Sequence, residues 1–187
     1  VFPPVEEGEK FKVRMLFWVP SDNILQRAKR DRVPYDVWAR EGWITTTDGN
    51  VIDYSAIRRD INELPYQIRE IAIDRWNATQ LATQLGEDDG LNVFLMGQGF
   101  VSMAAPTKEL ERVLVGREMA HGGNPVLKWM ASNVAVRQDP AGNLKPDKGK
   151  STEKIDGIVA LVMGLGRAAL MLGPKVSKYE TDDLLVL

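Results

Sequence analysis

The order of apolar and polar residues predicts a chain in which strands alternate with helices. Apolar runs predict strands over 11–19, 68–74, 91–96 and 134–137. Apolar positions three and four residues apart predict helices over 24–32, 54–64, 78–85, 107–115, 124–132 and 152–172. A short helix is expected over 33–40, with Pro34 in its first turn. Residues 43–46 and 51–52 flank the turn dipeptide Asp48-Gly49, which predicts a hairpin.

The central part of the chain has the order strand, helix, strand within 68–96. This spacing is typical of a βαβ unit, whose two strands are parallel. The chain has 187 residues, the length of one ordinary domain. We therefore expect a single α/β domain over 1–187.

The final predicted helix has small residues along one face. They recur at intervals of three or four positions and are Gly157, Ala160, Gly164 and Ala168. Each glycine costs about 1 kcal/mol of helix propensity relative to alanine, so a compensating contact is needed. We expect this face to pack closely against a sheet.

Composition narrows the class of protein. Hydrophobic residues make up 44% and charged residues 27%, as in a folded globular domain. The absence of cysteine excludes disulfides and thiolate zinc sites and favours an intracellular setting. The longest apolar run stops at Arg167, far short of the roughly 20 residues that span a bilayer, so no membrane role is expected. With a net charge of -2, any DNA contact must be local.

Two aspartates occupy positions where chemistry is plausible. Asp74 ends a predicted strand, and the carboxyl ends of strands in open α/β sheets are where ligands bind. Asp74 is equally well placed to cap the following helix. Asp156 lies in the first turn of the final helix, where the helix dipole favours a negative charge even without a function. The apolar Ile155 and Ile158 beside it nevertheless place it near the sheet.

Converging carboxylates without histidine or cysteine form an oxygen-ligand site, which prefers Mg²⁺ or Mn²⁺. Such ions activate water and neutralise charge on phosphate, and two ions can clamp the attacking and leaving oxygens. This chemistry usually needs at least three carboxylates. The sequence offers two obvious ones.

A lysine-rich loop precedes Asp156. Its basic residues, with the lysine that ends it, are Lys145, Lys148, Lys150 and Lys154. They either bind DNA phosphates next to the acidic site or simply form a solvated loop. The single histidine, His121, either anchors a turn or contacts a phosphate.

A phosphate-binding P-loop is a further alternative. Gly149-Lys150-Ser151-Thr152 matches the end of that motif, but Leu144 stands where its first glycine is required. The mismatch argues against nucleotide binding.

Three stretches, in their order and spacing, resemble the C-terminal half of the large terminase subunit of tailed phages. They are Ile73-Asp74-Arg75-Trp76-Asn77-Ala78, residues 121–133 beginning His121-Gly122-Gly123-Asn124-Pro125, and residues 147–160 with Lys154-Ile155-Asp156-Gly157. Residues 17–20, 31–35 and 177–180 fit the same pattern. The resemblance thus covers nearly the whole chain.

The resemblance implies a ribonuclease H-like fold, a mixed sheet flanked by helices. It implies an endonuclease that cuts concatemeric viral DNA during head packaging, with two Mg²⁺ or Mn²⁺ ions held by aspartates. Asp74 matches the ligand at a strand end and Asp156 the late ligand on a helix, and Lys148, Lys150, Lys154 and His121 are the candidate DNA contacts. The implied partners are double-stranded viral DNA, the terminase ATPase domain, the small terminase subunit and the portal, in the host cytoplasm.

The chain departs from the family at its beginning. The family's first strand, mid-sheet and carrying the first catalytic aspartate, is expected before Val1, so the sheet is expected to be incomplete there. We expect the isolated chain to bind metal weakly and to cut DNA poorly or not at all. We also expect the sheet to rearrange or fill its centre, for example by pairing with a second copy as a homo-oligomer. The alternative is a non-catalytic DNA-packaging or docking module.

Overall fold

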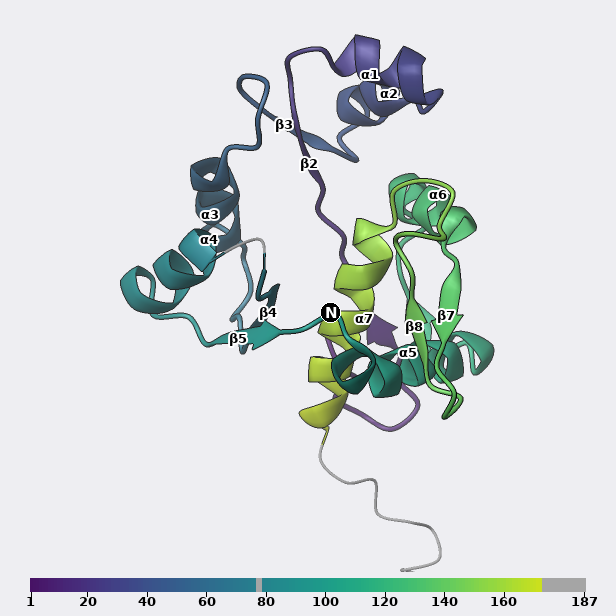
Figure 1. Ribbon diagram of the computed structural model, residues 1–187. Coiled ribbons are helices and arrows are strands. Elements are labelled where there is room, and N and C mark those ends of the chain that lie inside the picture. The colour runs from purple at the N-terminus through teal and green to yellow at the C-terminus, as the bar shows by residue number, and fades with distance from the viewer. Residues whose placement is uncertain (77–78, 173–187) are drawn as a thin grey trace, which may run out of the picture.

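Helix α7 (Asp156–Leu170) is the central element of the computed structural model, which describes residues 1–76 and 79–172 (Figure 1). It packs against α5 (Phe100–Val115), α6 (Pro125–Asn133) and β4 (Ile71–Asp74). Its buried residues are Gly157, Ile158, Val159, Leu161, Val162, Met163, Leu165 and Ala168. Ala78, the expected start of a helix, and residues 177–180 of the family pattern lie outside the described residues.

The strands form four two-stranded units, three of them parallel. The parallel units are β1 (Phe11–Lys12) with β6 (Met119–Ala120), β2 (Trp18–Pro20) with β3 (Thr45–Thr47), and β4 with β5 (Val93–Met96). The antiparallel unit is β7 (Val136–Gln138) with β8 (Leu144–Pro146). The predicted parallel pair at the centre of the chain is confirmed. Among the described residues the four units are not hydrogen-bonded into one continuous sheet.

The remaining helices lie in the first half of the chain. They are α1 (Ile24–Asp31), α2 (Tyr35–Arg40), α3 (Tyr54–Asn62) and α4 (Thr79–Thr83), which continues as the π-helical turn η1 (Gln84–Asp88). Side-chain caps explain two of the starts. Asp53 accepts a hydrogen bond from Ser55 N at 2.8 Å before α3, and Asn124 accepts one from Leu127 N at 3.0 Å before α6. In the part of the chain that is described, no helix is long and apolar enough to cross a membrane.

Several local predictions were wrong. The predicted strand over 11–19 is interrupted, because only Phe11–Lys12 and Trp18–Pro20 are strands. The predicted hairpin around Asp48-Gly49 is absent from the described structure, because Thr45–Thr47 pairs in parallel with β2 and 51–52 is not a strand. The predicted helix over 107–115 begins earlier, at Phe100, and runs through Pro106. Proline normally ends a helix because it lacks a donor and clashes with the preceding turn. Pro106 lies directly against Gly166 of α7.

The small residues of α7 do make close contacts, but against helices and chain segments rather than a sheet. A Cβ atom at Gly157 would lie 2.8 Å from Met130 Sδ of α6 and 2.8 Å from Phe17 Cε1. One at Gly166 would lie 2.6 Å from Pro106 Cγ of α5. Ala160 is exposed. The expected packing against a sheet is therefore corrected: α7 approaches α5 and α6 most closely.

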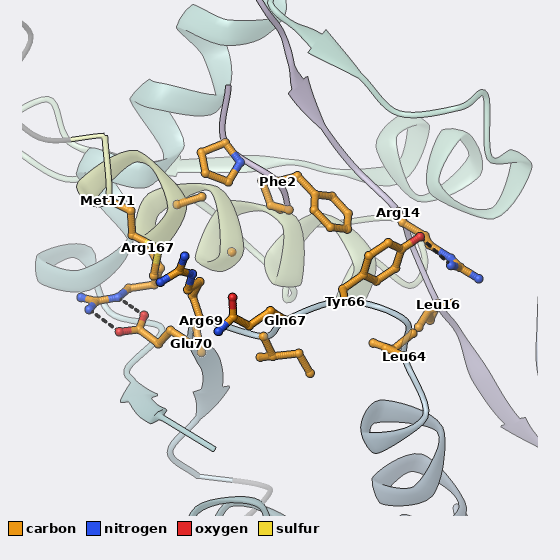
Figure 2. A pocket seen from close by; sticks show the side chains of 16 residues that line it. Phe2, Arg14, Leu16, Leu64, Tyr66, Gln67, Arg69, Glu70, Arg167 and Met171 are labelled. Carbon is orange, nitrogen blue, oxygen red and sulfur yellow. Dashed lines mark hydrogen bonds and ion pairs between the residues drawn. The ribbon is translucent and has the colours of Figure 1, made fainter. Parts of the chain in front are cut away.

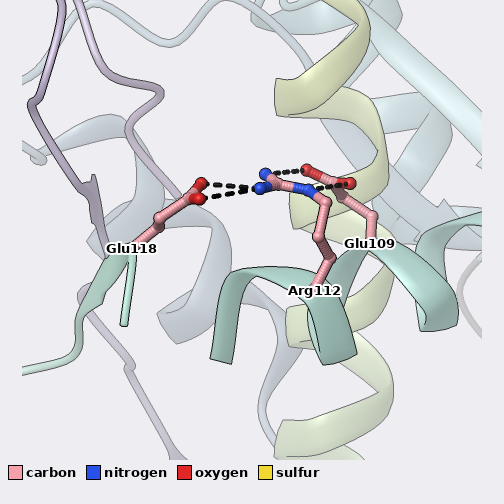
Figure 3. Close-up of polar contacts among 3 residues, drawn as sticks. All are labelled: Glu109, Arg112 and Glu118. Atoms are coloured by element: carbon pink, nitrogen blue, oxygen red, sulfur yellow. Dashed lines mark hydrogen bonds and ion pairs between the residues drawn. The ribbon is translucent and has the colours of Figure 1, made fainter. Parts of the chain in front are cut away.

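Charged side chains connect neighbouring elements. Arg112 links α5 to the start of β6 through Glu109 and Glu118, with shortest distances of 2.8 Å (Figure 3). These side chains are substantially exposed, so the cluster contributes little to stability. Between α3 and η1, Arg58 pairs with Asp89 at 2.6 Å, and this hydrogen bonding lowers the pKa of Asp89 to about 2.

A pocket of about 270 Å³ lies between the N-terminal segment, residues 64–72 and α7 (Figure 2). Tyr66 joins its two sides by side-chain contacts: its ring lies 4.9 Å from that of Phe2, and its hydroxyl accepts a hydrogen bond from Arg14 at 3.0 Å. Arg167 of α7, which also lines the pocket, forms a double hydrogen bond with Glu70 just before β4. The N-terminal segment and the segment before β4 thus meet at Tyr66 through side chains.

Candidate functional site

Asp74 is the last residue of β4 and pairs in register with Met96 of β5. Ile73 before it is buried, whereas Asp74 itself is half-exposed at the carboxyl end of the parallel pair. Its Oδ1 accepts a hydrogen bond from Trp76 N at 3.3 Å and its Oδ2 one from Gln98 Nε2 at 2.8 Å. The strand and these two donors fix the direction of the carboxylate.

Gln98 is a site residue that the sequence reasoning missed. Its amide holds Asp74, and its backbone carbonyl accepts a hydrogen bond from Lys145 Nζ at 2.9 Å. Lys145 also lies over the ring of Phe100, 5.5 Å from its centroid. The position of Gln98 in the sequence could have indicated this role. Gln98 follows β5, and the residues at the carboxyl ends of two neighbouring parallel strands lie side by side.

Asp156 is the first residue of α7, and its side chain is 62% exposed. Buried Ile155 and Gly157 flank it, and the Gly157 N–H points to Met130 Sδ at 3.1 Å. This close packing holds the start of α7 against α6. Lys148 Nζ lies 2.8 Å from Asp156 Oδ1 and compensates its charge.

The two aspartates have separate surroundings. No hydrogen bond or ion pair between described residues connects Asp74 with Asp156. Their oxygens are the donors that Mg²⁺ and Mn²⁺ prefer, so the chemistry of the donors fits a metal ion. The number of donors does not fit a metal ion. In residues 1–76 and 79–172, no group of three acidic, histidine or cysteine side chains could hold a metal ion. The described residues therefore do not make a complete two-ion centre.

The lysine-rich loop has a defined backbone. Asp147 Oδ1 accepts hydrogen bonds from Gly149 N at 2.9 Å and Lys150 N at 3.3 Å. Ser151 Oγ donates to Asp147 O at 2.7 Å and accepts from Ala135 N at 3.0 Å, which ties the loop to the segment after α6. The loop is thus stabilised by its own contacts and leads directly to Asp156.

The structure brings Lys148 and Lys154 to Asp156, and all three line one small pocket. Lys150 lies in the same loop and is exposed. His121 is exposed in the loop before α6, followed by Gly122 and Gly123 at φ values of 65° and 68°. No hydrogen bond or ion pair between described residues connects His121 with either aspartate.

Asp156 also lines a larger cleft of about 650 Å³. The cleft is bounded by β2, α1, the loop after β3, α6 and the start of α7. A volume of this size is within the range of ligand-binding pockets in proteins. Asp156 is therefore accessible from a cleft that contains other functional groups.

Comparison with known proteins gives the wider context. Residues 8–171 match the family described as "Terminase large subunit, endonuclease domain". The terminase large subunit of Enterobacteria phage HK97 is 41% identical over 156 residues, which is 81% of this chain and 31% of that protein. Protein YmfN of Escherichia coli K12 is 34% identical over 184 residues, 94% of this chain and 38% of that protein.

A solved structure agrees with these matches. The crystal structure of the HK97 bacteriophage large terminase superposes with a TM-score of 0.74 at 40% identity, covering 81% of this chain and 32% of that one. The predicted α/β, ribonuclease H-like class is confirmed. The chain spans about a third of the length of the relatives it matches.

Proposed function

Because the chain belongs to the endonuclease-domain family of terminase large subunits, we propose that it cuts concatemeric viral DNA during packaging. The match over residues 8–171 carries this proposal, since it includes both candidate aspartates and every candidate DNA-binding residue. The position of Asp74 at the end of a parallel strand supports it further.

The proposed metal ligands are Asp74 and Asp156, with Mg²⁺ or Mn²⁺ as the ion. When bound, such an ion supplies an activated water and neutralises charge on the scissile phosphate. The roles of the chain's own residues follow from their contacts. Gln98 orients the Asp74 carboxylate through its 2.8 Å hydrogen bond, and Lys148 compensates the charge of Asp156. A complete centre requires at least one more carboxylate beside these two.

The proposed DNA contacts are Lys148, Lys150, Lys154 and His121. Lysine side chains at the start of α7 provide the local positive charge that a chain of net charge -2 needs to bind DNA. The proposed partners are double-stranded viral DNA, the terminase ATPase domain, the small terminase subunit and the portal, in the cytoplasm of the bacterial host.

The second candidate is a non-catalytic DNA-packaging or docking module. It is favoured by the absence, among the described residues, of a three-carboxylate group. The two candidates differ in whether a divalent ion binds at the aspartates.

Calorimetric titration with Mn²⁺ tests the proposal. We expect weak binding to the chain and at least about tenfold weaker binding for Asp74→Asn and for Asp156→Asn. Asp48→Asn, which removes the same charge from an exposed loop, is the matched control and should bind as the unsubstituted chain does. Binding that is equal in all four proteins would refute the assignment of the ligands and favour the docking module.

A further inference from the structure

Helix α1 forms one wall of the cleft that leads to Asp156. Arg27 and Arg30 of α1 line the cleft together with Lys154 and Asp156. None of the residues of α1 is buried, so this helix makes few of the contacts that ordinarily hold a helix in a core. Its sequence from 27 to 32 has four basic residues and one acidic residue, a local charge of +3 in a chain of net charge -2.

The side chains that line the cleft carry a small excess of positive charge. The basic ones are Arg27, Arg30 and Lys154, and the acidic ones are Asp31 and Asp156, which leaves an excess of +1. Both acids are already paired, Asp31 with Arg30 at 2.6 Å and Asp156 with Lys148 at 2.8 Å.

Two basic side chains of the cleft, Arg27 and Lys154, use few of their N–H donors in hydrogen bonds to the rest of the chain. Arg27 makes one long hydrogen bond, from Nη2 to Asn50 O at 3.5 Å. The ammonium of Lys154 forms no hydrogen bond or salt bridge with any described residue, and its charge, like that of Arg27, interacts electrostatically with Asp31. A guanidinium with most of its donors available matches the geometry of a phosphate group.

Aromatic side chains also line the cleft. Trp129 of α6 packs edge-on against Tyr35 at 6.1 Å between ring centroids, and both line the cleft. Trp18 lines it from β2, with its indole N–H donating to Asp60 at 2.7 Å. Proteins that bind a nucleic-acid strand often have a groove of this kind. Its basic side chains contact the backbone phosphates, and its aromatic side chains stack against the bases.

We propose that this cleft binds the phosphodiester backbone of a DNA strand, with Arg27 and Arg30 of α1 and Lys154 contacting phosphates in the same cleft as Asp156. This inference rests on the proposed function, because the cleft would guide the DNA strand to Asp156, which is proposed there as a metal ligand for cleavage. It adds the basic face of α1 to the DNA contacts of the lysine-rich loop. The positively charged groups recognise phosphates, which single-stranded and duplex DNA share. The bound strand can therefore belong to either form of DNA.

Fluorescence anisotropy with labelled oligonucleotides, without divalent ions, tests the assignment. The variants are Arg27→Ala, Arg27→Lys and the matched control Lys29→Ala, which removes the same charge from an exposed position on α1 that does not line the cleft. We expect Arg27→Ala to weaken binding about fivefold to tenfold at low salt and to lower the salt slope by about one. Arg27→Lys should recover part of the loss, and Lys29→Ala should change affinity less than about twofold.

Each outcome has a distinct meaning. Equal effects of Arg27→Ala and Lys29→Ala would overturn the cleft proposal. If Lys148→Ala and Lys150→Ala then still weaken binding, DNA binding by the lysine-rich loop stands without the cleft. A chain that binds neither single-stranded nor duplex DNA would overturn both proposals. A larger loss with one of the two oligonucleotides identifies the source of the strand.

Discussion

Two glycines of α7, only two residues apart, should respond in opposite ways to the same substitution. At Gly166 a new Cβ would lie 2.6 Å from Pro106 Cγ and 2.8 Å from Pro106 Cβ. At Gly164 it would meet Val1 Cγ2 at 3.2 Å and Val1 Cβ at 3.9 Å. The first neighbour is a rigid ring inside α5, and the second is the side chain of the first residue of the chain.

The magnitudes follow from these contacts. Alanine gains about 1 kcal/mol over glycine inside a helix, and this gain applies at both positions. Overpacking against Pro106 costs about 1–3 kcal/mol, because neither α5 nor α7 can move without disturbing the core. Gly166→Ala should therefore lower the free energy of unfolding by up to about 2 kcal/mol. Gly164→Ala should raise it by up to about 1 kcal/mol, since the Val1 side chain can shift by a few tenths of an ångström.

Urea unfolding followed by circular dichroism measures both variants against the unsubstituted chain. A change of 1 kcal/mol corresponds to about 2–4 °C in Tm for a domain of this size, so a thermal scan provides a second readout. Stabilisation of the same size by both substitutions would refute the close approach of α5 and α7 at Pro106. Destabilisation by both would refute the looser contact at Gly164.

Three further predictions concern the site and its supports. Gln98→Ala should keep the fold but lower Mn²⁺ affinity about tenfold, because Asp74 loses its 2.8 Å hydrogen bond; an unchanged titration would contradict this role. The pKa of Asp89 is lowered from 3.8 to about 2 in the folded chain, so its stabilisation is complete above pH 4 and is lost as the pH falls towards 2. Urea midpoints between pH 5 and 2 should therefore depend less on pH in Asp89→Asn. Glu70→Gln should destabilise the chain by about 1–2 kcal/mol in urea unfolding, because Arg167 keeps its charge and loses its partner; no change would show that the pair is not formed.

The positions of both candidate aspartates could be predicted from the sequence because they depend on local pattern. Asp74 ends an apolar run that forms a strand, and Asp156 begins an apolar helix with the expected period. Strand 93–96 and its parallel pairing with β4 followed from the same local order.

Contacts between distant residues could not be predicted in this way. Nothing near Thr45–Thr47 indicates that its partner is β2, more than twenty residues earlier, instead of 51–52 across a favourable turn. The close packing of Pro106 in α5 depends on Gly166, sixty residues later, which the spacing of small residues did not single out. Gln98 likewise gains its role only because β5 lies beside β4.

Nicking of supercoiled plasmid is the most direct test of the central claim, that this chain contributes Asp74 and Asp156 to DNA cleavage. At high protein concentration with Mn²⁺, we predict slow conversion to open circles that stops on chelation. Asp74→Asn and Asp156→Asn should abolish it, and Asp48→Asn should not. Cleavage that persists unchanged in both site variants, or efficient cleavage at low protein concentration, would contradict the account.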